Sequence, residues 1–423
     1  ICRKIETQMA IIKPFKGVRP QPQFAAQVAS RPYDVLNSAE AREEAAGNPY
    51  SFLHVCKPEI DLPESTDVYS QEVYDKGKAN LHQMISDGIL FQDASACMYV
   101  YRQIMNGHSQ VGLVANSSID DYFNDIIKKH EFTRPEKEND RIRHMATLEC
   151  HPEPVFLTYP DVAEIDSIMN QAIQQTPEYD FTAEDGIQHT FWKIEDAAIN
   201  EKIEALFAEK VPFTYIADGH HRSASSAKVG QQLREAHPDY TGAEPFNFFL
   251  SVLFPASQLM IMDYNRVVKD LNGNVPMEFF KKLDASFTIK HMGTEAYKPQ
   301  RMHEFSLYFD GHWYQLLAKE HTYNDNDPIE CLDVTVLTNY LLDPILGIKD
   351  QRTDKRIDFV GGIRGMSELK KRVDSGEMQV AIALYPVAIQ QLINISDSGN
   401  VMPPKSTWFE PKLRSGLVVH MFN

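Results

Sequence analysis

The stretch that decides the fold is Phe213-Thr-Tyr-Ile-Ala-Asp-Gly-His-His-Arg222. Its first five residues are rich in aromatic and β-branched types, which predicts a short buried strand. Gly219 favours an abrupt turn, because glycine adopts backbone angles that other residues resist. The small residues that follow, with Val229, Leu233 and Ala236 at helical spacing, predict a helix after the turn.

A strand that runs through a glycine turn into a helix is suited to binding an anion. Unpaired backbone N–H groups and the positive end of the helix dipole point to the same place. Asp218, His220, His221 and Arg222 add ionisable groups there, so phosphate is the expected ligand. A plainer interpretation is that Asp218 caps the helix and the histidines pair with nearby backbone. Four such groups within five positions favour a functional site.

Composition limits the classes of function. The chain has 423 residues, of which 43% are hydrophobic and 24% charged, so two or three domains with ordinary cores are expected. A net charge of -17 argues against nucleic acid and anionic membranes as partners. Five scattered cysteines without a Cys-x-x-Cys pair, and no long apolar run, predict a cytoplasmic protein with reduced thiols. The oligomeric state stays open, a homo-oligomer included.

The order of predicted elements favours a mixed α/β fold. Buried strands at 155–159 and 191–194 are followed by an amphipathic helix near 199–207, which leads into the strand at 213–217. The hydrophobic pattern begins at about Met9, after polar residues 1–8. We expect an N-terminal α/β domain over 9–270 that carries the turn. A C-terminal α/β domain over 271–423 would begin at the Asn-Gly-Asn-Val-Pro linker.

A second polar cluster covers residues 128–141. A helix over 119–127 is expected to lead into it, with Pro135 interrupting the helix. One interpretation is a solvated helix end with ion pairs. However, a phosphate site needs cations from several segments, and this segment mixes several residue types. The candidate binding residues here are His130, Thr133, Arg134, Lys137 and Arg141, and Glu131 is a candidate catalytic residue.

Two further segments contribute candidates. Lys405, Ser406 and Thr407 lie between prolines and aromatic residues near the carboxyl end. This loop either binds an anion or closes a sheet, and the sequence does not decide between them. Asp34, in Arg31-Pro-Tyr-Asp34, is either a site residue or a polar group of a loop.

Together the three clusters resemble a prokaryotic family known as domain of unknown function 1015. The resemblance rests on Asp-Gly-His-His-Arg at 218–222, on His-Glu-x-Thr at 130–133 and on Lys-Ser-Thr-Trp-Phe at 405–409. The turn is also similar to that of the ParB and sulfiredoxin-like superfamily, which includes free serine kinases. That similarity implies a ParB/sulfiredoxin-like strand-turn-helix core inside a larger, multi-domain protein. His220 stands where sulfiredoxins carry a reactive cysteine, which argues against thiol-sulfinate chemistry.

The resemblance implies phosphoryl transfer to a small hydroxylated metabolite, most of all free serine or phosphoserine. Asp218, His220, His221 and Arg222 would then bind a nucleotide or pyrophosphate donor. Glu131 is the first candidate for the catalytic carboxylate, and Asp34 is the second. Either Glu131 or Asp218 would take the hydroxyl proton, and the other would hold Mg²⁺. The alternatives are a phosphoserine phosphatase-type hydrolase and a non-catalytic sensor of phosphorylated metabolites.

Overall fold

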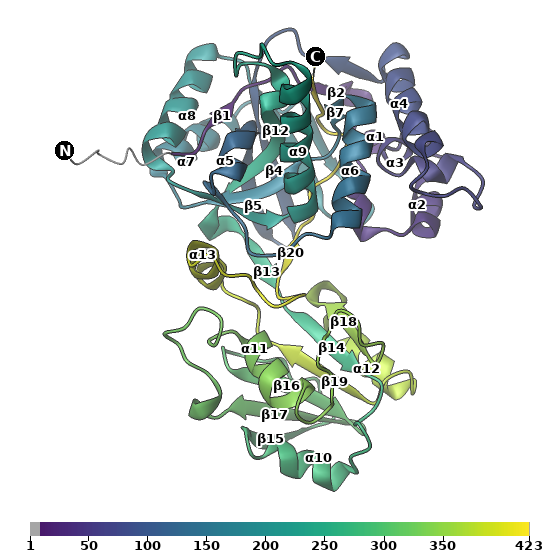
Figure 1. The fold of residues 1–423 in the computed structure, drawn as a ribbon, viewed down its shortest axis with the longest axis vertical. Helices are drawn as coiled ribbons and strands as arrows, with labels where there is room; N and C mark the ends of the chain where they lie inside the picture. Colours follow the sequence, from purple (N-terminus) through teal and green to yellow (C-terminus); the bar gives the residue numbers. More distant parts are fainter. Residues whose placement is uncertain (1–8, 423) are drawn as a thin grey trace, which may run out of the picture. The chain divides into compact units, whose positions relative to one another are not determined.

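The computed structural model describes residues 9–422, and these residues form two compact units (Figure 1). The first unit contains the chain up to Leu259 together with the segment from Pro411 onward, and the second contains Met260–Glu410. This division differs from the predicted one at residues 270 and 271. Strand β14 (Tyr264–Val268) pairs with two strands of the second unit, and the chain returns to the first unit for its last segment. The predicted mixed α/β class is confirmed.

The first unit is built on one large mixed sheet. Its strands follow the order β6-β11-β8-β12-β5-β4-β10-β9, with β1 paired beside β5. Strands β4 and β5 form a hairpin across Asn106-Gly107, a residue pair that favours a tight turn. The strands are β1 (Ile12–Lys13), β4 (Met98–Met105), β5 (His108–Ser118), β6 (Ile127–Lys128), β8 (Val155–Tyr159), β9 (Tyr179–Thr182), β10 (Gln188–Ile194), β11 (Thr214–Asp218) and β12 (Phe248–Pro255). Two short pairs, β2 (Val18–Pro20) with β3 (Leu90–Gln92) and β7 (Cys150–His151) with β21 (His420–Met421), complete the strands of this unit.

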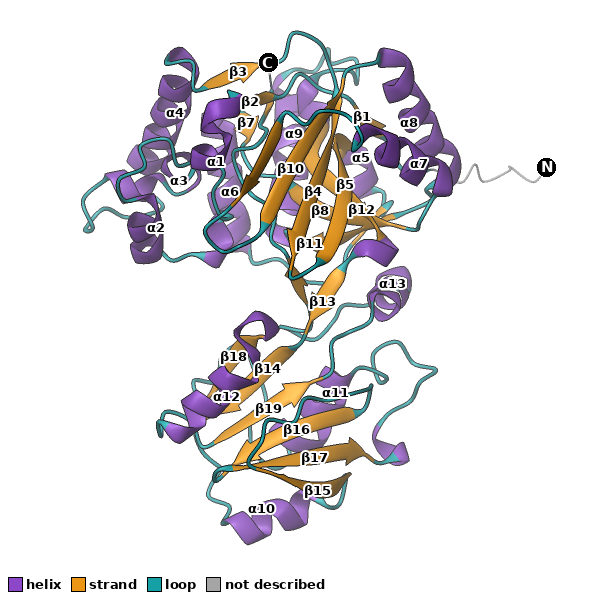
Figure 2. Ribbon diagram, turned by 180° about the vertical axis from the view of Figure 1, so that it is seen from behind, coloured by secondary structure: helices purple, strands orange, loops and turns teal. Residues whose placement is uncertain are grey.

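Helices α6 and α9 pack side by side (Figure 1), and α9 packs against strands β8 and β12 of this sheet. In Figure 2, α9 lies behind strands β4, β5 and β10. The small residues 223–227 of α9 are all buried, which lets the helix approach its neighbours closely. The helices of the unit are α1 (Ala25–Val28), α2 (Ser38–Ala45), α3 (Leu53–Cys56), α4 (Gln71–Ser86), α5 (Ile119–Phe123), α6 (Pro135–Leu148), α7 (Ala163–Ala172), α8 (Ala197–Lys210) and α9 (His220–Ala236).

The prediction that Pro135 interrupts a helix is wrong. Helix α5 ends at Phe123, the short strand β6 follows, and Pro135 is the first residue of α6. Proline is favoured at this position, because the N–H groups of a first helical turn have no partner within the helix. Residues 129–134 are therefore a connection between β6 and α6.

The second unit contains a six-stranded sheet in the order β15-β17-β16-β19-β14-β18 and a separate pair, β13 with β20. Strands β16 and β17 form a hairpin across Asp310-Gly311. The hydrophobic core of the second unit includes Trp313 and Tyr308. The remaining elements are β13 (Met260–Met262), β15 (Phe287–Gly293), β16 (Glu304–Phe309), β17 (His312–Ala318), β18 (Ile357–Gly361), β19 (Val380–Leu384), β20 (Trp408–Glu410), α10 (Pro276–Leu283), α11 (Asp333–Leu337), α12 (Gly365–Asp374) and α13 (Ile389–Asp397).

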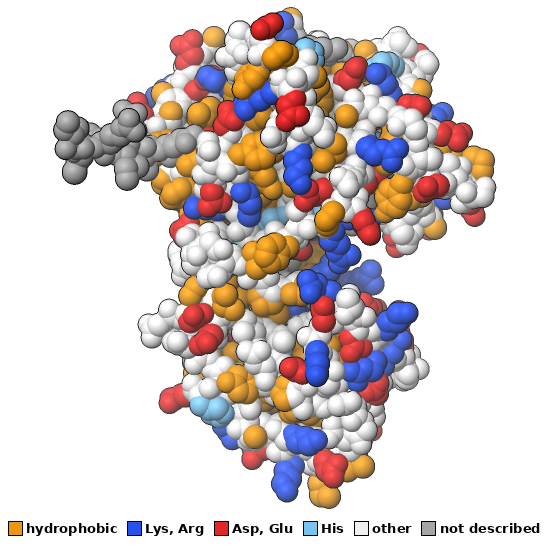
Figure 3. Space-filling model, viewed as in Figure 1, with side chains coloured by type: hydrophobic (Ala, Val, Ile, Leu, Met, Phe, Trp, Pro, Cys, Tyr) orange, Lys and Arg blue, Asp and Glu red, His pale blue; other side chains and the backbone are white. Residues whose placement is uncertain are grey.

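The described residues agree with several expectations from composition. Within residues 9–422, none of the helices combines the length and the apolar character needed to cross a membrane. Cys56, Cys97, Cys150 and Cys331 are buried and free of disulfides, whereas Cys2 lies outside the described residues. On the face of the first unit in Figure 3, acidic and basic side chains are interspersed among apolar ones.

Candidate functional site

The predicted strand-turn-helix is confirmed at Asp218–His220. Strand β11 ends at Asp218, Gly219 has a φ of 90°, and the 17-residue helix α9 begins at His220. The Asp218 carboxylate accepts a hydrogen bond from the Gly219 N–H at 2.8 Å, and no side chain caps the helix. The first N–H groups of α9 therefore keep their capacity to bind an anion.

Arg222 is the buried cation of this turn, with 5% of its surface exposed. Its guanidinium donates to the Pro154 carbonyl at 2.6 Å and to Asp34 Oδ2 at 3.4 Å, and it lies 3.9 Å from Asp218 Oδ2. Burial alone would lower the pKa of Arg222, but Asp34, Asp218 and Glu153 outweigh burial and raise it. Its Nε has no hydrogen-bond partner among the described residues. A permanently charged donor with an unused N–H is what a phosphate oxygen binds.

Gly219 leaves room for this guanidinium. A Cβ at position 219 would lie 3.0 Å from Arg222 Nε and 3.1 Å from its Cζ. The positive φ and the close contact both require glycine here. Arg222 thus folds back over the turn that begins its own helix.

We expect Gly219→Ala to lower the free energy of unfolding by about 1–3 kcal/mol and to weaken phosphate binding. The backbone strain and the displaced guanidinium both contribute. Gly293→Ala is the matched control, since Gly293 has a φ of 93° and open space around it. Urea denaturation and calorimetric titration with pyrophosphate measure the two effects. Equal pyrophosphate affinity in both variants would show that the contact with Arg222 has no role in binding.

Asp218 is held as a carboxylate. Burial would raise its pKa, but Lys412, Arg222 and the Gly219 N–H together outweigh burial and lower it. The Lys412 ammonium lies 3.0 Å from Asp218 Oδ2. Lys412 was not among the predicted site residues. Its position shortly after the polar loop at residues 405–407 could have marked it as a candidate. An anionic carboxylate so firmly paired is a weak proton acceptor and a good partner for cations.

Two imidazoles face each other beside the turn. The rings of His130 and His220 meet edge to face with centroids 4.4 Å apart. The backbone N–H of His130 donates a hydrogen bond to His220 Nε2 at 3.4 Å. The proton of neutral His220 is therefore on Nδ1. This Nδ1 lies 3.9 Å from Glu131 Oε2. Burial lowers the pKa of His220 well below its ordinary value and that of His130 to about 4. Both rings are neutral at physiological pH.

His221 fixes the other end of the same connection. Its Nε2 accepts a hydrogen bond from the Arg134 N–H at 3.0 Å. Burial lowers the pKa of His221, and the charges of Arg134 and Lys137 add to that effect. The first two residues of α9 thus hold residues 130–134 at both ends, and they bring Glu131, Arg134 and Lys137 to the turn.

Replacing His130 by glutamine should flatten the pH dependence of stability. The folded pKa of about 4 lies below the unfolded value, so the unfolded chain binds more protons between these values. The His130 contribution is therefore complete above about pH 6.5 and is lost as the pH falls toward 4. The difference in unfolding free energy between pH 7.5 and pH 5 should shrink by about 2 kcal/mol in the variant. His82→Gln, at an exposed position of α4, should leave that difference unchanged in urea denaturation.

Two other candidates lie close by but are engaged in structural contacts. Thr133 donates to the Glu138 carboxylate, which also pairs with Lys228. Arg141 is buried, pairs with Asp140 at 2.8 Å and lies over the Tyr33 ring at 4.1 Å. Arg141 therefore supports the packing around the site in this structure.

Lys405, Ser406 and Thr407 belong to the second unit. There the Lys405 carbonyl accepts a hydrogen bond from Arg266 at 3.0 Å, and the Ser406 hydroxyl donates to the Pro403 carbonyl. Arg266 is fully buried and also contacts the Tyr264 carbonyl, so this loop is internally well supported. Their contribution to the site at the turn stays a prediction.

Glu153 is a buried carboxylate that sequence reasoning missed. It accepts hydrogen bonds from the Tyr33 N–H at 3.0 Å and the Ser415 hydroxyl at 2.9 Å. Burial raises its pKa, although Arg222 and other cations oppose that effect. Its place between two prolines, just before strand β8, was the only signal for it.

The site at the turn offers few side chains that could hold a metal ion. Among residues 9–422, no three or more histidine, cysteine or acidic side chains gather closely enough to hold a metal ion on their own. Mg²⁺ bound together with phosphate needs only one or two carboxylates. Asp218 and Glu131 fit that requirement, because both lie at the turn, but Asp218 is already paired with Lys412.

Three similar solved structures share little sequence with this chain. Truncated SbnI from Staphylococcus aureus is 11% identical with a TM-score of 0.36, covering 70% of this chain and 82% of its own. A conserved hypothetical protein from Pyrococcus furiosus is 14% identical with a TM-score of 0.33, covering 72% and 95%. A free serine kinase in complex with AMP is 13% identical with a TM-score of 0.35, covering 72% and 91%.

The family assignment comes from sequence. No curated protein matches the chain. The model of a family described as protein of unknown function (DUF1015) matches residues 12–335, which is most of the chain. This match includes the turn at Asp218–Arg222 and the connection at residues 130–134, and it confirms the predicted family. The chain belongs to the DUF1015 family.

Proposed function

We propose that this protein transfers a phosphoryl group from a nucleotide or pyrophosphate donor to a small hydroxylated metabolite, with free serine as the preferred acceptor. One observation carries the proposal. Arg222 is buried, held in its charged form, and folded over an uncapped helix N-terminus with its Nε unpaired. Phosphoryl transfer depends on such fixed positive charge, because negative charge spreads over the phosphoryl oxygens in the transition state.

The donor phosphates would lie against the first turn of α9. Arg222 and the N–H groups of α9 would bind the phosphoryl oxygens, and Arg134 and Lys137 would approach from the connection that His220 and His221 hold. Mg²⁺, where it accompanies the donor, would be held by Asp218 and would neutralise charge on the phosphates. His130 and His220 are neutral, so Arg222, Arg134 and Lys137 would supply the positive charge for the donor.

The acceptor would be activated by Glu131. Its carboxylate lies beside His220, and half of its side chain is exposed, so an incoming hydroxyl can reach it. The serine hydroxyl oxygen would attack the terminal phosphorus, the bond to the bridging oxygen would break, and Glu131 would take the hydroxyl proton. Serine is chosen because the Asp-Gly-His-His-Arg turn resembles that of free serine kinases.

Phe132 favours a nucleotide over pyrophosphate as the donor. It is 75% exposed, and the backbone two residues before it and two residues after it is hydrogen-bonded to His220 and His221 at the start of α9. A rigidly presented aromatic ring beside a phosphate site is suited to stacking against a nucleotide base.

We therefore expect Phe132→Ala to raise the KM for ATP about fivefold to twentyfold, since base stacking contributes about 1–2 kcal/mol. The KM for pyrophosphate should not change. Phe123→Ala is the control, because Phe123 is also exposed but lies on α5. Steady-state kinetics with each donor test this. An equal effect on both donors would contradict base stacking.

The function itself is tested with the full chain. Serine is incubated with ATP, ADP or pyrophosphate, and phosphoserine is incubated alone, each with and without Mg²⁺, and products are followed by phosphorus NMR. Formation of phosphoserine supports the proposal. Release of phosphate from phosphoserine alone would make the protein a hydrolase. No turnover, together with a raised melting temperature in the presence of donor, would make it a sensor.

A further inference from the structure

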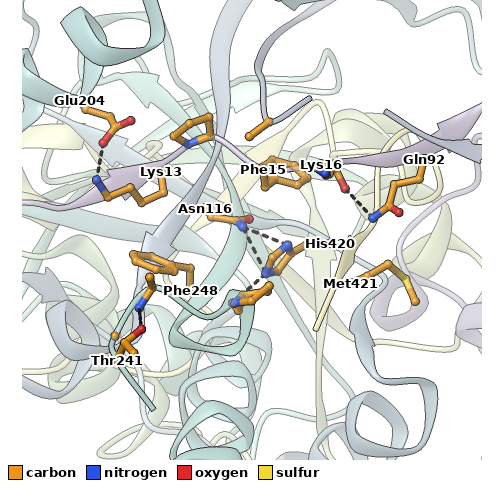
Figure 4. Close-up of a pocket in the computed structure, with 15 residues that line it drawn as sticks. Lys13, Phe15, Lys16, Gln92, Asn116, Glu204, Thr241, Phe248, His420 and Met421 are labelled. Atoms are coloured by element: carbon orange, nitrogen blue, oxygen red, sulfur yellow. Dashed lines mark hydrogen bonds and ion pairs between the residues drawn. The ribbon is translucent and has the colours of Figure 1, made fainter. Parts of the chain in front are cut away.

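A second cavity of about 700 Å³ lies in the first unit, apart from the turn (Figure 4). It forms where the beginning of the chain, strand β5, the residues after α9 and the terminal strand β21 come together. Its volume is in the range of sites that enclose a small metabolite. None of the residues that line it belongs to the proposed phosphate site.

The polar part of the cavity wall is the pair His420 and Asn116, which Figure 4 shows in contact. The His420 Nε2 lies 3.0 Å from the Pro245 carbonyl, so it carries the proton. The Asn116 amide nitrogen lies 3.0 Å from His420 Nδ1 and 3.2 Å from Nε2, and it donates to Nδ1, the ring nitrogen without the proton. This arrangement fixes the orientation of the Asn116 side chain. Its oxygen is left without a partner among the described residues, although Asn116 is only 2% exposed.

An unpaired acceptor in a cavity wall is the group that a ligand donor would satisfy. Leaving such an oxygen unpaired and buried is unfavourable, because it loses its hydrogen bonds to water without replacing them. Burial lowers the pKa of His420 to about 4, so the neighbouring ring is neutral and does not supply the missing proton. The wall thus offers one acceptor to an N–H or O–H of a ligand.

The remaining wall is mostly apolar and includes flat surfaces. Phe15 is held edge to face against Tyr99, with ring centroids 5.5 Å apart, and against His420 at 5.4 Å. Phe248 lines the cavity and is half-buried. Aromatic walls of this kind favour a planar ligand.

The cavity wall contains two lysines and one glutamate, so it carries one more positive than negative side chain. Lys13 pairs with Glu204, and both line the cavity. Lys16 also lines it and is exposed, and its ammonium has no partner among the described residues. An anionic group on the ligand would therefore be attracted to Lys16.

We propose that this cavity binds a small planar molecule that has a nitrogen-bearing aromatic ring and one anionic group. A ring N–H or amino group would donate to the Asn116 oxygen, the ring would lie against Phe15 and Phe248, and the anion would pair with Lys16. The anion is either a phosphate or a carboxylate, and the two probes below distinguish them.

The test uses the full chain labelled with ¹³C at its methionine methyl groups. Met421 lines the cavity, and its signal is assigned with Met421→Leu. Adenosine monophosphate and indole-3-acetate are titrated separately. We expect a saturable shift of the Met421 signal with at least one probe, with adenosine monophosphate identifying phosphate and indole-3-acetate identifying carboxylate.

Variants test the proposed contacts. Lys16→Gln should weaken binding about fivefold, whereas Lys202→Gln, an equally exposed lysine on α8, should not. Asn116→Ser should weaken binding about tenfold or more, and its melting curve shows whether it folds. Because Lys16 is exposed, its variant remains folded and informative. No Met421 shift with either probe would overturn the proposal, and so would equal affinity in the two lysine variants.

Discussion

Replacing Arg222 by methionine should lower kcat/KM for phosphoryl transfer about 10³-fold, the loss expected when a fixed cation is removed from a phosphoryl transition state. It should also lower the free energy of unfolding by about 3–5 kcal/mol, because removing one member of a buried ion network leaves the others unpaired. Asp34, Asp218 and Glu153 are the carboxylates that would lose their common cation. Kinetics at a temperature where both proteins are folded, and urea denaturation, give the two values.

Two further variants separate charge from geometry. Arg222→Lys should recover part of the stability but little of the activity, since an ammonium cannot reproduce the contacts with the Pro154 carbonyl and Asp34 together. Arg234→Met removes an arginine from the same helix that also pairs with an aspartate, Asp120, but at a part-exposed position. It should leave kcat/KM unchanged and cost about 1 kcal/mol or less. Full activity in Arg222→Met would refute the proposed donor site.

The sequence predicted the turn correctly because its signals are local. A buried strand, a glycine that must take a positive φ and a helix with small residues on its packed face all occur within one short segment. The placement of residues 130–134 beside the turn was predicted only as an association of polar clusters. The structure supplies its cause, since His220 and His221 accept backbone hydrogen bonds from the two ends of that connection.

Other features depend on contacts that local patterns do not encode. Glu153 looks like an ordinary polar residue in the sequence, and its importance comes from Tyr33 and Ser415, which are far away along the chain. Lys412 reaches Asp218 only because the last segment leaves the second unit and returns to the first. Periodicity in a sequence reports which side of an element is buried, but not which distant segment covers it.

The second large effect concerns the division of roles between two carboxylates. Glu131→Gln should lower kcat by about 10²–10⁴, because it removes the group proposed to accept the hydroxyl proton. The dissociation constant for the donor should change less than about twofold, since glutamine keeps the size of the side chain and the connection is held through its backbone. Glu136→Gln, at an exposed position in the first turn of α6, is the matched control and should keep full activity.

Asp218→Asn should behave differently from Glu131→Gln. Lys412 and Arg222 stabilise the Asp218 carboxylate, which makes it a weak base, and its loss removes one carboxylate partner from each cation. The expected result is weaker Mg²⁺-dependent donor binding and lower stability, measured by calorimetry and urea denaturation. The reverse pattern, with Glu131→Gln fully active and Asp218→Asn inactive but still binding donor, would assign proton transfer to Asp218. Since the pKa of Asp218 is lowered by two cations, a donor site that used it as the base would first have to move Lys412 away.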